Sequence, residues 1–130
     1  MYEKELIERA RKARENAYAP YSKFKVGAAI LTEDGEVYTG VNVENASFGL
    51  TVCAERVALF KAVSDGKRSF KAIAVVADSE EPVPPCGACR QVLSEFGDMK
   101  VIMANLKGDV KIARLRDLLP DSFKFEEGKR

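Results

Sequence analysis

Apolar residues recur along the chain with two different periods, which separate predicted helices from predicted strands. In residues 2–17 the apolar positions fall three and four apart, which predicts an amphipathic helix. Residues 25–32 form a rather apolar run, and residues 36–43 alternate between apolar and polar. The Glu-Asp-Gly sequence between these two runs is typical of a β-hairpin. We therefore expect a helix followed by a two-stranded hairpin.

The rest of the chain alternates between helix and strand patterns. Helices are predicted at residues 53–64, which are rich in apolar side chains, and at residues 86–96, which follow a proline-rich loop. Residues 71–77 are apolar on both faces, as in a central strand, and residues 101–104 and 110–113 read as two further strands. A short turn then leads to the tail. The order α-β-β-α-β-α-β-β-α predicts an α/β fold, a five-stranded mixed sheet with helices packed on it.

Length and charge limit the classes of function. The chain has 130 residues, so we expect residues 1–130 to form a single domain, with residues 126–130 disordered. Its 21 basic and 20 acidic residues are mixed along the sequence and give no concentrated basic face. We therefore expect a small substrate rather than nucleic acid. No apolar run approaches the ~20 residues of a membrane span, and we expect neither a membrane segment nor a signal peptide.

Candidate chemistry gathers at three cysteines, Cys53, Cys86 and Cys89. Their odd number argues against a secreted disulfide framework and favours the cytoplasm, where free thiolates can bind metal. The chain has no histidine, so a zinc ion here would be held by three thiolates with one tetrahedral position open. An open position distinguishes catalytic from structural zinc. Glu55 lies two residues after the first thiol, which suggests a metal-activated water with its own proton shuttle.

The spacing of these residues predicts where they lie on their helices. In mid-helix, Cys53 and Glu55 would point ~200° apart, so Cys53 is expected at or just before the first turn. Cys86 and Cys89 are three residues apart and fall on one helix face. All three thiols are therefore expected at helix N-termini, where the dipole stabilises negative sulfur.

The charge of such a site needs compensation. Three thiolates give a zinc centre a net negative charge, which weakens its ability to activate water. Arg56 directly follows the carboxylate, and we expect its guanidinium to hydrogen-bond thiolate sulfur and offset that charge. Arg90 could act similarly or be exposed to solvent.

Two motifs, Cys-Ala-Glu-Arg at residues 53–56 and Pro-Cys-Gly-Ala-Cys-Arg-Gln at residues 85–91, resemble the zinc-dependent cytidine deaminases. The similarity is greatest to the small homotetrameric branch with three cysteine ligands. Residues 18–29, 40–46 and 118–123 match further segments of that family, so the resemblance covers most of the chain. It implies a three-layer α-β-α sandwich around the five-stranded sheet, and a homotetramer with shared active sites.

The resemblance also implies the chemistry. Cys53, Cys86 and Cys89 would bind one Zn²⁺ per subunit, with water as the fourth ligand. Glu55 would carry protons in the hydrolytic deamination of cytidine and 2′-deoxycytidine to uridine and 2′-deoxyuridine plus ammonia. This reaction belongs to pyrimidine salvage.

Contacts to the nucleoside follow from the same resemblance. Asn42 and Glu44 would hydrogen-bond the ribose hydroxyls, Phe24 would pack on the pyrimidine ring, and the Ala54 N–H would bond the base carbonyl. Two residues would reach into a neighbouring subunit's pocket, Phe48 and Phe123. The first of these stands where tyrosine is more usual, so stacking is retained without a phenol hydroxyl.

Other functions remain open from the residues. Deaminases of other aminopyrimidine compounds, such as blasticidin S, share the zinc motifs, although residues 42–45 and 21–24 favour a plain nucleoside. A polynucleotide-editing deaminase is disfavoured by the near-neutral charge. A non-catalytic zinc module would not need Glu55. A redox protein would use only Cys86 and Cys89.

Overall fold

The computed structural model describes residues 2–125 and contains the predicted elements in the predicted order. The elements are α1 (Glu3–Arg14), β1 (Val26–Thr32), β2 (Val37–Val41), η1 (Phe48–Leu50), α2 (Ala54–Ser64), β3 (Phe70–Ala77), α3 (Gly87–Ser94), β4 (Lys100–Asn105), β5 (Val110–Arg114) and α4 (Leu115–Leu118). Helices α1 and α3 are shorter than predicted, and the 3₁₀ turn η1 was not predicted. The disorder expected for residues 126–130 lies outside the described residues. No described helix is long and apolar enough to cross a membrane.

The five strands form one mixed sheet in the order β2-β1-β3-β4-β5. Strands β3 and β4 pair in parallel, with Ile73 opposite Val101, and the other neighbours pair antiparallel. The parallel pair is joined through α3, as a crossover connection requires. Strand β3 is central and buried from Ala72 to Ala77, because helices cover both of its faces. The five-stranded mixed sheet is therefore confirmed.

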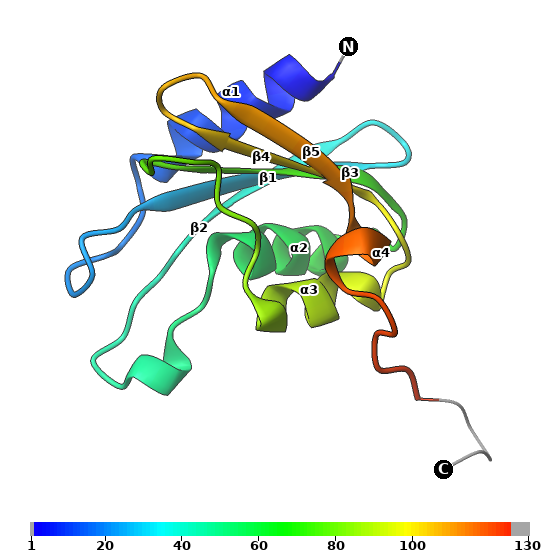
Figure 1. The fold of residues 1–130 in the computed structure, drawn as a ribbon. Helices are drawn as coiled ribbons and strands as arrows, with labels where there is room; N and C mark the ends of the chain where they lie inside the picture. Colours follow the sequence, from blue (N-terminus) through cyan, green and yellow to red (C-terminus); the bar gives the residue numbers. More distant parts are fainter. Residues whose placement is uncertain (1, 126–130) are drawn as a thin grey trace.

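The helices form a layer on each face of the sheet (Figure 1). Helix α1 covers one face, where Leu6 and Ala10 pack in a cluster with Ala29 and Ala74. Helices α2, α3 and α4 lie on the opposite face, around a second cluster that includes Leu59. This arrangement confirms the three-layer sandwich. It also places the N-termini of α2 and α3, which carry the candidate ligands, on the same side of the sheet.

The distance of α2 from the sheet is set by a glycine in β2. A Cβ atom added at Gly40 would lie 2.4 Å from the Ala58 nitrogen and 2.5 Å from the Ala54 carbonyl oxygen. Both contacts are to helix backbone, so a larger residue would push α2 outward. Gly40 thus controls the position of the helix that begins next to Cys53.

Gly40→Ala should destabilise the fold by about 1–3 kcal/mol through overpacking against α2. Urea denaturation measures this change in the free energy of unfolding. Gly49→Ala is the matched control, because an added Cβ there meets nothing within 4 Å. Equal urea midpoints for the two variants would contradict the close contact between Gly40 and α2.

Candidate metal centre and its pocket

Two of the three cysteines cap helices. Cys53 precedes α2 with φ −74° and ψ 156°, and Cys86 precedes α3 with φ −66° and ψ 168°. Both backbones are extended, as expected for a residue before the first turn. Cys89 lies in the first turn of α3 and is fully buried. The prediction that all three thiols lie at helix N-termini is confirmed.

The three sulfur atoms lie close enough to share one metal ion. The Cys86 Sγ is 3.4 Å from the Cys89 Sγ and 3.7 Å from the Cys53 Sγ, and all three lie within 4.8 Å of one another. Zn–S bonds of about 2.3 Å in a tetrahedral site separate neighbouring sulfurs by about 3.8 Å. The cysteines are free thiols, so this donor set fits a Zn²⁺ ion with one position left for another ligand.

The surroundings of the thiols favour negative sulfur. A hydrogen bond from Cys89 and the guanidinium of Arg56 lower the pKa of Cys53 to about 5. The contact with Cys53 in turn raises the pKa of Cys89. The Arg56 Nη2 lies 3.6 Å from the Cys53 Sγ, which is the thiol contact expected of this arginine. Its Nε is buried and has no hydrogen-bond partner among the described residues, a cost that attraction to thiolate charge offsets.

A buried carboxyl group lies beside the thiols. Glu55 is 4% exposed, although it is a charged residue in the first turn of α2. Burial raises the pKa of Glu55 to about 7, so its protonated and ionised forms are both populated near neutral pH. A group with such a pKa can both take up and release a proton efficiently.

These groups open into a cavity of about 250 Å³. Cys53, Cys86 and Glu55 line one part of the cavity, together with Ala54. The remaining walls are formed by Ser22, Phe24, Val26, Asn42, Glu44, Thr51, Val75, Ala77, Val83 and Pro84. The four residues that are expected to contact substrate within one chain therefore line the same cavity as Cys53, Cys86 and Glu55. They are Phe24, Asn42, Glu44 and Ala54. Chemically, the cavity can hold a small planar molecule against a metal-bound water and a proton carrier.

Comparison with known proteins identifies the family. Residues 1–105 match the model of the cytidine and deoxycytidylate deaminase zinc-binding region. The chain belongs to this deaminase family. Proteins named cytidine deaminase from Sporosarcina psychrophila and Halalkalibacterium halodurans are 60% and 58% identical to it over 94% of its length, covering 91% and 94% of those proteins. The crystal structure of cytidine deaminase from Burkholderia pseudomallei superposes with a TM-score of 0.92 at 56% identity, covering 95% of this chain and all of that one.

In this deaminase, Asn42 and Glu44 already hold the loop that carries Phe24. The Asn42 amide donates to the Phe24 carbonyl at 2.8 Å and accepts from the Val26 N–H at 2.9 Å. Glu44 accepts from the N–H groups of Tyr21 and Ser22, each at 3.0 Å, and from the Ser22 hydroxyl. These bonds with Ser22 hold the pKa of Glu44 below its usual range. Sequence reasoning assigned both side chains to the ribose and missed their part in positioning the loop.

The aromatic residues of the predicted site divide into two groups. Phe24 lines the cavity and is 40% exposed. Phe48 and Phe123 are 70% and 59% exposed, and neither is among the described residues that line the cavity of their own chain. Their expected role in a neighbouring subunit's pocket therefore stays a prediction.

Arg90 does not take the role suggested for it beside the thiolates. Its guanidinium donates to the carbonyl oxygens of Pro85 and Leu118 at 2.7 and 2.9 Å. The sequence offered no signal for these partners, since one of them lies 28 residues away.

Glu44→Gln should loosen the loop between α1 and β1, because a neutral amide accepts hydrogen bonds less strongly than a carboxylate. Amide hydrogen exchange at Tyr21 and Ser22 should become about tenfold faster. Glu33→Gln, at an exposed acid in the β1–β2 turn, is the control and should leave that exchange unchanged. Unchanged exchange in Glu44→Gln would show that the loop is held by other contacts.

Proposed function

We propose that this protein catalyses the hydrolytic deamination of cytidine and 2′-deoxycytidine, a pyrimidine-salvage reaction, with Glu55 as the proton carrier. The observation that supports this most directly is the buried Glu55 carboxyl beside a three-thiol cluster in one small cavity. A structural zinc site has no use for such a group. The relatives at 58–60% identity, all named cytidine deaminase, favour a plain nucleoside substrate over the alternatives.

Cys53, Cys86 and Cys89 would hold Zn²⁺, which would lower the pKa of a water molecule in the cavity. Glu55 would take a proton from this water and deliver it to the ring N3 of the cytosine, which makes C4 more electrophilic, and the hydroxide oxygen would bond to C4. Glu55 would then take the proton of the new C4 hydroxyl and pass it to the amino group, so that the C4–N bond breaks, the C4 carbonyl forms and ammonia leaves. Its pKa of about 7 and its burial suit both transfers, because each form is accessible and bulk water does not compete.

The other residues lining the cavity orient the nucleoside. The exposed face of Phe24 suits the flat pyrimidine ring. Ala54 begins α2, so its N–H is one of those that the helix leaves unpaired and can donate to the base carbonyl. Glu44 makes three of the roughly four hydrogen bonds that a carboxylate accepts, and Asn42 keeps one amide hydrogen, so each can still bond a ribose hydroxyl. Arg56 offsets the thiolate charge.

Glu55→Gln should keep its zinc but lose turnover by at least 10²–10⁴-fold, the usual worth of general acid–base catalysis. The test is ultraviolet absorbance of cytidine and deoxycytidine, alongside zinc content of each purified protein. Loss of zinc from the variant would make Glu55 a ligand and the assigned role wrong. Unchanged absorbance with zinc-loaded wild type would overturn the proposed function itself.

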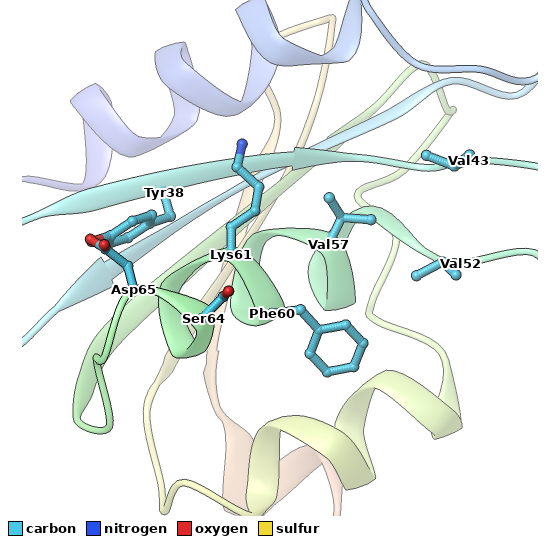
Figure 2. Close-up of a pocket in the computed structure, with 8 residues that line it drawn as sticks. All are labelled: Tyr38, Val43, Val52, Val57, Phe60, Lys61, Ser64 and Asp65. Carbon is cyan, nitrogen blue, oxygen red and sulfur yellow. The ribbon is translucent and has the colours of Figure 1, made fainter.

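We also propose that the protein forms a homotetramer with shared active sites. A groove of about 910 Å³ runs along α2, lined mainly by apolar residues (Figure 2). Phe60 is 49% exposed in this groove, which Val43, Val52 and Val57 also line. Contiguous exposed apolar side chains of this kind are one mark of a protein–protein interface. Phe48 is 70% exposed and does not line the cavity of its own chain, which leaves its ring exposed toward a neighbouring subunit.

Phe60→Glu should dissociate the assembly, because it places a charge in an apolar interface. Light scattering after size exclusion should give four times the chain mass for the wild type and less for the variant. Ile112→Glu is the matched control, at a residue of 50% exposure on β5. A monomeric wild type would refute the tetramer, and dissociation by Ile112→Glu alone would place the interface elsewhere.

The remaining predictions concern the domain and the compartment. One sheet with a core cluster on each face supports a single domain over residues 1–130. Three free thiols arranged for metal binding support a reducing compartment, the cytoplasm.

A further inference from the structure

Two consecutive residues of α3 hold the C-terminal segment. The Arg90 Nη1 donates to the Leu118 carbonyl at 2.9 Å. The Gln91 amide donates to the Phe123 carbonyl at 3.0 Å and accepts from the Phe123 N–H at 3.3 Å. The same Arg90 guanidinium also donates through Nε to the Pro85 carbonyl at 2.7 Å. Arg90 therefore joins the chain directly ahead of Cys86 to the end of α4.

This connection acts on the most exposed of the three cysteines. Cys89 is fully buried in α3, whereas Cys86 is exposed at the start of that helix. The loop before it contains Pro84 and Pro85, which have no N–H to donate to the rest of the fold. The Pro85 carbonyl is thus a point at which the loop can be fixed, and Arg90 binds it.

The other end of the connection is well anchored. Leu118 packs against the core cluster that includes Leu93 and Leu115. Leu118 ends α4, so its carbonyl has no helical partner and is available to a donor. A planar guanidinium presents several N–H groups at fixed angles and can bind both carbonyls at once, which a lysine ammonium on a flexible stem does poorly.

We propose that Arg90 is a positioning residue, whose bridge between the Pro85 and Leu118 carbonyls sets the Cys86 sulfur at the correct distance from the other two thiols. The inference rests on the zinc-binding role proposed for the cysteines. It differs from the role of Arg56, which contacts sulfur directly. The Arg90 guanidinium acts through the two backbone carbonyls that it binds rather than through a contact with sulfur.

The test measures how firmly the purified protein holds zinc. Arg90→Ala and Arg90→Lys should both transfer zinc to a competing chelator about 10–100-fold faster than wild type, the usual effect of losing a group that orients a ligand. The cobalt-substituted variants should show altered thiolate-to-cobalt absorption. Circular dichroism verifies that each variant is folded. If Arg90→Ala does not fold, the test rests on Arg90→Lys, which keeps the positive charge.

Arg68→Ala is the matched control. Arg68 also donates to two backbone carbonyls, those of Val63 and Lys67, but at the C-terminal end of α2. It should release zinc at the wild-type rate. Equal release from the Arg90 and Arg68 variants, with unchanged cobalt spectra, would overturn the inference alone. A wild-type protein that binds no zinc would overturn the proposed function as well.

Discussion

The convergence of two helix N-termini on one point is the constraint on which the site depends. Cys53 and Cys86 both cap their helices with extended backbone, and Cys89 follows in the first turn of α3. Unpaired N–H groups and the helix dipoles therefore face the sulfurs, where they stabilise thiolate. Because α2 rests directly on Gly40 in β2, the sheet fixes where one of these ends lies.

Charge and burial follow from that geometry. Without a histidine, the three sulfurs concentrate negative charge, and Arg56 is close enough to offset it. Glu55 follows Cys53 by two residues and is turned into the buried cavity, which raises its pKa to about 7. The same helix start thus brings together a thiol, a buried carboxyl group and a guanidinium, each in a different environment.

The loops around the cavity are held by side chains from other segments. Glu44 and Asn42 fix the loop that presents Phe24, and Arg90 fixes the loop ahead of Cys86. Loops with few backbone hydrogen bonds of their own need such support to hold the side chains of a site in place. Several residues whose type suggests substrate or metal contact therefore serve also to position backbone.

The sequence alone determined the element order and the mixed sheet, and it singled out the three cysteines that cluster and the nearby Glu55, because hydrophobic period and short motif spacing are local properties. It could not determine the bond from Arg90 to the Leu118 carbonyl or the loop contacts of Glu44, since those join segments more than twenty residues apart. The tertiary structure decided which polar side chains face the cavity and which bind backbone. A polar side chain can use the same donor or acceptor atoms for a ligand or for backbone. Only the folded positions of the backbone groups decide which of the two it binds.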